Sequence, residues 1–192
     1  MTSKLATTLA ASLALSALVA GCATEGTKPP QAAEPAVAVS RSRNEMNRDD
    51  GVARVVMRTL AEADRNSFRA VTAEVWNGRT LLVGAVSKPE QRRRASGLAK
   101  GVEGVTEVID ELILAEDKTF AAFSPVAQVE NDLRGRILSD DAIKGFYSVR
   151  VVNGVAYMLG VAPTADEILR VKAIAMEHPQ VKWVVSHVQV AK

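Results

Sequence analysis

The feature that most constrains the fold of this chain is an internal repeat. The stretch Val75-Trp76-Asn77-Gly78 recurs as Val151-Val152-Asn153-Gly154, an offset of 154 − 78 = 76 residues. At that offset the glycine and aliphatic positions keep one register to the end of each copy: Gly84 with Gly160, Val105 with Val181, Val108 with Val184, Leu112 with Val188, and Leu114 with Val190. Such self-similarity predicts two copies of one folded unit.

Each copy predicts the order helix, strand, strand, helix, strand. Apolar residues four apart, as at Val52, Val56 and Leu60, indicate an amphipathic first helix. The Asn-Gly pairs indicate hairpins, because a type I′ turn needs positive φ at both central residues. The remaining elements are expected at 71–76, 80–86, 89–100 and 105–114 in the first copy, and at 149–152, 155–161, 164–177 and 181–190 in the second.

Particular residues are predicted to shape these elements. Ser124 is expected to be the N-cap of the second copy's first helix, with Pro125 at the first helical position. Gly84 and Gly160 lie inside a strand, which predicts a close backbone approach, expected here from a helix. The predicted turn and packing positions are Asn77, Gly78, Gly84, Asn153, Gly154 and Gly160.

These elements predict an α+β chain of two tandem αββαβ domains, each a three-stranded mixed sheet covered by two helices. The expected limits are 49–116 and 125–192, joined by a linker at 117–124. Domains of about 65 residues have a limited core, so packing the two copies together would add stability. The chain has one cysteine, which excludes an intramolecular disulfide.

The N-terminal segment predicts export. Lys4 precedes an apolar run, residues 5–20, that is shorter than the roughly 20 residues of a bilayer-spanning helix. The end of the run, Val19-Ala20-Gly21-Cys22, resembles the lipobox of bacterial lipoproteins. That resemblance implies removal of residues 1–21 as a signal peptide and lipidation of Cys22. Residue 23 is Ala rather than Asp, which resembles the pattern of lipoproteins that are sorted to the outer membrane.

The segment that begins at the cysteine, residues 22–48, is predicted to be a flexible tether. It contains Pro29, Pro30 and Pro35, and it shows no sustained apolar period. A segment of this composition does not bury enough surface to offset the entropy lost on ordering.

The repeat also carries a family resemblance. In the first copy, Asn-Gly is followed by Leu-Val-Gly-Ala-Val at 82–86, an Ala-rich helix, and Gly104-Val105-x-x-Val108-x-Asp110-x-Leu112-x-Leu114. This pattern resembles the BON domain. The second copy departs from it only at Gln180 and Ser186, and its apolar register is intact. Together with the lipobox, the chain resembles the dual BON-domain lipoproteins of the Gram-negative outer membrane.

The resemblance implies a lipid-anchored protein on the periplasmic face of the outer membrane. It further implies association with phospholipid, expected to be anionic, and a role in envelope integrity. No cofactor is expected beyond a diacylglycerol and an N-acyl chain on Cys22. An alternative stays open, in which the domains are an adaptor for an outer-membrane assembly complex or another envelope partner and lipid is only the tether.

Charge and motif content weigh against other functions. The 24 basic and 22 acidic residues leave a formal charge of +2, without the basic excess typical of nucleic-acid binders. No Ser or Cys has a nearby base, no metal-ligand spacing occurs, and His178 and His187 are expected to be inert surface residues. We therefore expect a protein that is not an enzyme, has no metal and binds no nucleic acid.

Two groups of residues are candidates for lipid binding. One is the run Arg92, Arg93 and Arg94 in a predicted helix, where cations would face anionic headgroups. Its alternative is a solvated helix face, with a structural role for Arg94. The other joins an apolar wedge to basic residues of the next helix: Phe120, Phe123, Arg134 and Arg136. Its alternative is that both rings pack in the domain interface.

The two tryptophans are further candidates. Trp76 ends a predicted strand, and Trp183 begins one. A tryptophan at a strand end can anchor a partner, or it can cap a small core.

Overall fold

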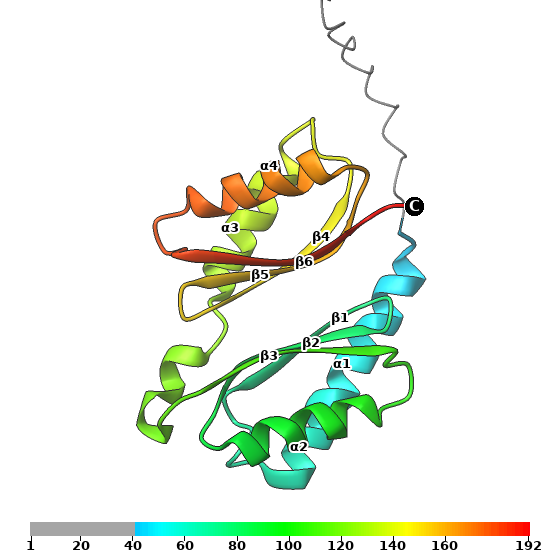
Figure 1. Cartoon of the computed structure of the whole chain (residues 1–192). Helices are drawn as coiled ribbons and strands as arrows, with labels where there is room; N and C mark the ends of the chain where they lie inside the picture. The colour runs from blue at the N-terminus through cyan, green and yellow to red at the C-terminus, as the bar shows by residue number, and fades with distance from the viewer. Residues whose placement is uncertain (1–40) are drawn as a thin grey trace, which may run out of the picture. The chain divides into compact units, whose positions relative to one another are not determined.

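The computed structural model describes residues 41–192 (Figure 1). The predicted signal peptide, Cys22 and the predicted tether up to residue 40 lie outside these residues. The described part contains two consecutive units of the same element order, joined by a 3₁₀ helix, η1 (Asp117–Phe123).

The first unit has the predicted αββαβ order. It consists of α1 (Arg43–Asp64), β1 (Val71–Trp76), β2 (Arg79–Val86), α2 (Pro89–Lys100) and β3 (Glu107–Leu114). The central strand β2 pairs antiparallel with β1 and parallel with β3. The predicted three-stranded mixed sheet is thereby confirmed.

The second unit repeats this topology. It consists of α3 (Ala127–Leu138), β4 (Phe146–Val152), β5 (Val155–Ala162), α4 (Ala165–Met176) and β6 (Trp183–Val190). Strand β5 is central, antiparallel to β4 and parallel to β6. The α+β class with two tandem domains is therefore correct.

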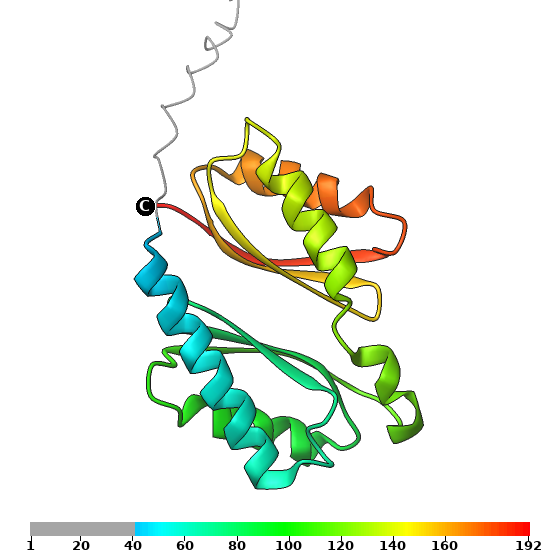
Figure 2. The same ribbon diagram turned by 180° about the vertical axis from the view of Figure 1, so that it is seen from behind.

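In each unit, two helices cover one face of the sheet. Figures 1 and 2 show α1 and α2 on one face of the first sheet, and α3 and α4 on one face of the second. The helix–sheet core of the first unit includes Val56, Leu60, Leu82, Ala99 and Leu112, and that of the second is built in the same way. The helical apolar periods seen in the sequence point into these two cores.

The opposite sheet faces contribute to one shared core. Side chains alternate between the two faces along a strand, so Leu81, Val83 and Ala85 point away from the helices. They form one buried cluster with Tyr157 and Leu159 of the second unit. The two units thus stabilise each other by burying faces that neither covers with its own helices.

Both hairpins turn as predicted. Asn77 and Asn153 have φ of 48° and 49°, and Gly78 and Gly154 both have φ of 77°. These are the left-handed conformations that a type I′ turn requires.

The strand glycines, in contrast, do not meet a helix as predicted. A Cβ on Gly84 would lie 1.9 Å from the carbonyl oxygen of Ala70, and one on Gly160 would lie 2.0 Å from that of Phe146. Ala70 immediately precedes β1 and Phe146 is the first residue of β4, and these strands are the antiparallel neighbours of β2 and β5. The close approach therefore comes from the backbone of the hairpin partner, and positive φ values of 116° and 147° make that contact possible.

The first helix begins earlier than the sequence led us to expect. Ser42 is its N-cap, and Glu45 completes a capping box, with Ser42 Oγ accepting from Glu45 N at 3.2 Å and Glu45 Oε2 accepting from Ser42 N at 2.7 Å. Residues 43–48, predicted as part of the tether, are therefore helical.

The predicted cap at Ser124 is wrong as well. Helix α3 begins at Ala127 with Val126 as its N-cap, and Ser124 instead ends η1. Pro125 forms an isolated β-bridge with Val152, which places the helix start two residues further along the chain.

Candidate functional site

A groove of about 570 Å³ lies between the start of α1 and the end of α3. The end of β1 and the segment between α3 and β4 also line it. Most of the lining side chains are apolar or aromatic: Met46, Trp76, Ile137, Leu138, Ile143, Phe146 and Tyr147. Ligand sites are typically concave and mainly apolar, with a few placed polar groups. This groove is therefore the candidate functional site.

One side of the groove is closed by a stacked cation. The Arg41 guanidinium lies 4.0 Å from the centroid of the Trp76 ring and forms an ion pair with the buried Asp49. Burial is the main influence on the pKa of Arg41, and it lowers that pKa. Because Asp49 and Trp76 already satisfy this charge, Arg41 is a poor candidate for an external anion.

Two other cations of the groove are uncommitted. Arg134 and Lys144 are both exposed, and Arg134 donates to the side-chain oxygen of Asn131 at 2.9 Å. Within residues 41–192, neither forms an ion pair with a carboxylate. Beside them on α3, Leu138 is 79 % exposed. Cations next to an exposed aliphatic side chain are the combination found at peripheral membrane sites.

The segment that carries Lys144 is held by a buried carboxylate of α4. Glu167 is 7 % exposed and accepts hydrogen bonds from Lys144 N at 2.9 Å, from Gly145 N at 2.7 Å and from the Tyr147 hydroxyl at 2.7 Å. Burial, together with the hydrogen bond and charge of Glu167, raises the pKa of Tyr147. The position of Lys144 at the groove therefore depends on Glu167.

The other end of the groove is braced by Asp49 of α1. Its carboxylate accepts from Asn77 N at 2.7 Å and from Gly78 N at 3.3 Å, so it caps the first hairpin turn. This contact fixes the turn that follows Trp76 to the first turns of α1.

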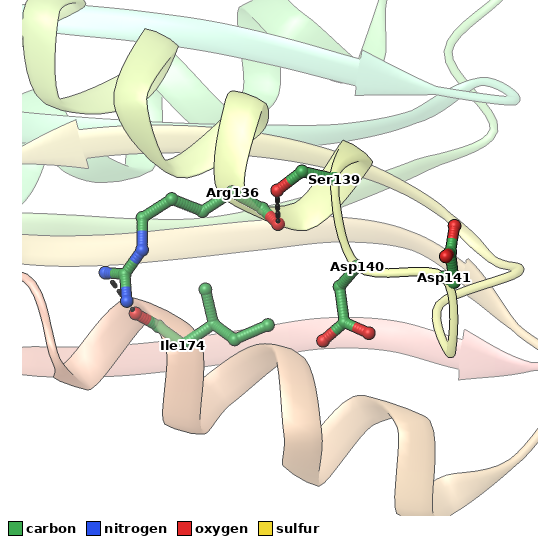
Figure 3. Close-up of a pocket in the computed structure, with 5 residues that line it drawn as sticks. All are labelled: Arg136, Ser139, Asp140, Asp141 and Ile174. Carbon is green, nitrogen blue, oxygen red and sulfur yellow. Dashed lines mark hydrogen bonds between the residues drawn. The ribbon is translucent and has the colours of Figure 1, made fainter.

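A second pocket, of about 400 Å³, lies between α3 and α4 (Figure 3). Arg136 reaches across it to donate to the Ile174 carbonyl at 3.1 Å and pairs with Glu177 at 2.5 Å. Asp140 and Asp141 also line it. Hydrogen bonds from Arg170 lower the pKa of Asp140. With its cation engaged and two carboxylates present, this pocket is unsuited to an anionic ligand.

The predicted arginine run does not form one surface. Arg92 pairs with Asp110 at 3.0 Å, and Arg93 pairs with Glu90 at 3.2 Å. Arg94 donates to the Ala63 carbonyl at 3.2 Å and lies over the Phe68 ring. Consecutive helical residues point about 100° apart, so each arginine finds a different partner.

The predicted apolar wedge is not on the surface. Phe120 and Phe123 are only 4 % and 7 % exposed, and both belong to the core shared by the two sheets. The expectation of exposed rings beside Arg134 and Arg136 is therefore corrected. In a chain with only 4 % aromatic residues, these rings fill space that the aliphatic side chains of the sheets leave between them.

Of the predicted cations, the structure brings only Arg134 to the groove. Sequence reasoning missed Met46, Leu138, Ile143 and Lys144. Leu138 offered a usable indication, because an aliphatic residue immediately after the buried Ile137 must point away from the core of an amphipathic helix. The two tryptophans differ, since Trp76 is 8 % exposed and lines the groove, whereas Trp183 is 65 % exposed.

Each of the two histidines lies beside a carboxylate. His187 lies 2.8 Å from Glu111, and His178 lies 3.5 Å from Asp132. His187 is therefore partnered rather than a lone surface residue. In the same residues there is no cluster of three metal-ligating side chains, and no helix is long and apolar enough to cross a membrane.

Comparisons with known proteins agree with the repeat. The family model of the BON domain matches residues 48–116 and 125–192. Outer membrane lipoprotein DolP of Haemophilus influenzae is 36 % identical over 92 residues, which span 47 % of each chain. An uncharacterised protein of Anaplasma centrale, described by its position in the gshII 5′ region, is 31 % identical over 64 % of this chain and 82 % of its own. Osmotically-inducible protein Y of Escherichia coli is 25 % identical over 71 % of this chain and 69 % of its own.

Proposed function

This chain belongs to the BON-domain family, and we propose that it is a lipid-anchored protein on the periplasmic face of the outer membrane. There it would associate with anionic phospholipid and support envelope integrity. Cys22 would carry the anchor, residues 23–40 would belong to the tether, and 49–116 and 125–192 would be the working domains. The similarity to an outer membrane lipoprotein supports the proposed location.

The observation that carries the lipid proposal is the groove beside α3. It combines an apolar lining with two cations, Arg134 and Lys144, that have no carboxylate partner within residues 41–192. Glu74 also lines the groove, and its carboxylate is paired with Arg150. Each Lys or Arg near an anionic bilayer contributes about 1 kcal/mol of attraction. The exposed Leu138 side chain would add apolar contact below the headgroups.

The proposal assigns the anchor and the domains different tasks. An acyl anchor alone holds the protein at any bilayer, because buried methylenes have no preference for headgroup charge. The two cations would add a preference for anionic lipid. They would also orient the second domain so that its α3 end faces the bilayer.

The test is vesicle co-sedimentation of the mature chain with Cys22→Ser, which removes the acyl chains from the measurement. We expect binding to phosphatidylglycerol-containing vesicles, little binding to phosphatidylcholine vesicles, and a loss of binding as salt is raised from low to moderate ionic strength. Absence of binding to both would contradict the lipid proposal and favour a protein partner as the function of the domains.

Charge reversals locate the site. Arg134→Glu with Lys144→Glu should abolish the anionic preference, because each places a carboxylate at the groove. Arg93→Glu with Lys100→Glu is the matched control, since both residues are exposed on α2. Equal losses in the two double variants would mean that general charge, rather than this groove, attracts the vesicles.

A further inference from the structure

The core shared by the two sheets is built from equivalent positions of the two repeats. Six of its residues in the first domain have their counterparts, 76 positions later, in or against the same cluster. The matched pairs are Ala70 with Phe146, Trp76 with Val152, Leu81 with Tyr157, Val83 with Leu159, Ala85 with Val161, and Ile109 with Val185. Both domains therefore use the same face, as the subunits of a two-fold symmetric dimer do.

Polar contacts across this interface also join positions that are 76 residues apart. The Glu74 carboxylate pairs with the Arg150 guanidinium, and His187 Nε2 lies 2.8 Å from Glu111 Oε1. In both pairs the partners are repeat equivalents (150 − 74 = 76 and 187 − 111 = 76). Close to a two-fold axis, a residue meets its own counterpart, so both contacts place an approximate two-fold axis between the domains.

At both positions the two repeats carry opposite chemistry. The first domain supplies Glu74 and Glu111, whereas the second supplies Arg150 and His187. In the same geometry, two first domains would bring glutamate against glutamate twice. Two second domains would bring arginine against arginine and histidine against histidine. Like charges facing each other across an interface are a general means of excluding wrong partners.

Side-chain volumes at equivalent positions are also complementary between the repeats. Ala70 in the first domain corresponds to Phe146 in the second, and Trp76 corresponds to Val152. Two identical faces would double either the large or the small member of each pair. One face of each kind combines one large and one small side chain from each pair of equivalent positions, as the observed core does.

We propose that this sheet face is a recognition surface on which a first domain accepts a second domain and rejects another first domain. The partner that it fits is the second domain of the same chain. The complementary equivalents, Glu74 with Arg150 and Glu111 with His187, enforce the choice. This arrangement keeps the apolar faces covered and prevents same-type pairing between neighbouring chains, which would expose the remaining faces.

The Glu111–His187 pair is the better one to test. Arg150 also pairs with the buried Glu130 at 3.0 Å, so reversing Arg150 would disturb a second contact. Near this pair, Arg79 donates to the His187 carbonyl at 2.9 Å and pairs with Glu107. Neither of these contacts uses the Glu111 or His187 side chain.

The experiment is a charge-swap cycle in the mature chain with Cys22→Ser and Trp183→Phe, which leaves Trp76 as the only tryptophan and a reporter of the shared core. Glu111→Lys and His187→Glu each create a poorly matched or like-charged pair, whereas the double variant restores opposite charges. We expect each single variant to lower the midpoint of thermal unfolding by several degrees and to shift Trp76 emission to longer wavelength. The double variant should recover most of both changes.

The matched control is the Glu90–Arg93 pair on α2, whose side chains are 70 % and 71 % exposed. Reversing either residue should leave Trp76 emission unchanged. Additive losses in the Glu111→Lys/His187→Glu double variant would overturn the proposal, as would single variants no different from the controls. If His187→Glu does not fold, Glu111→Gln and Glu111→Lys decide the matter. Lysine must destabilise more than glutamine, and the reverse order would also overturn the proposal.

Discussion

Replacing Gly84 by alanine tests how the hairpin closes. The added Cβ would lie 1.9 Å from the Ala70 carbonyl oxygen, about 1 Å inside the shortest tolerated contact, and the residue has φ of 116°. A non-glycine residue at such a φ costs about 1–3 kcal/mol. Moving the strands apart also weakens the Ala85 N to Ala70 O hydrogen bond of 3.0 Å, whose net value is about 1 kcal/mol. The expected loss of stability is therefore about 2–4 kcal/mol.

Urea denaturation followed by circular dichroism measures this loss, and Gly97→Ala provides the comparison. Gly97 lies inside α2, and a Cβ there would meet no atom within 4 Å. Alanine should stabilise the helix by about 0.5–1 kcal/mol. The two substitutions add the same methyl group, so opposite signs are expected. A Gly84→Ala variant as stable as the wild type would refute the reasoning from close backbone approach.

Three further predictions concern the groove and the shared core. Asp49→Ala should lower the free energy of unfolding by about 1–3 kcal/mol, because two turn N–H groups lose their buried acceptor. The control is Asp50→Ala, at an exposed position of the same helix. It should change the free energy of unfolding little in the same denaturation experiment. Glu167→Gln should lower the pKa of Tyr147, since the carboxylate charge that helps to raise it is removed; ultraviolet titration of the phenol checks this, and an unchanged pKa would exclude Glu167 as a contributor. Phe123→Ala should cost about 3–5 kcal/mol of stability as a buried aromatic, yet leave vesicle binding of the folded fraction unchanged, and a selective loss of binding would return Phe123 to the lipid site.

The order of elements was predictable because local patterns determine it. The Asn77-Gly78 and Asn153-Gly154 pairs impose φ > 0 on two neighbouring residues, and few other structures tolerate that conformation. The Ser42 and Glu45 capping box is equally local in the sequence, but it was missed, and residues 43–48 were predicted as tether. The β-branched runs on either side of each Asn-Gly pair located the hairpin strands to within about three residues.

The groove was not predictable from such patterns. Its walls come from three segments that lie far apart in sequence, represented by Met46, Trp76 and Leu138, and they meet only when the second domain folds beside the first. Phe120 and Phe123 illustrate the same limit. Near basic residues in the sequence, they resemble a membrane wedge, but the face that they cover is formed by strands of both repeats.

The most direct test of the proposed function places a reporter on Leu138. The chain has one cysteine, so Cys22→Ser followed by Leu138→Cys gives a single site for a polarity-sensitive fluorophore. Leu169→Cys is the control, because Leu169 is 61 % exposed on α4 and does not line the groove. We predict a blue shift of the Leu138 probe on adding phosphatidylglycerol vesicles and no shift of the Leu169 probe. Vesicle binding that shifts neither probe, or only the Leu169 probe, would contradict a lipid site at this groove.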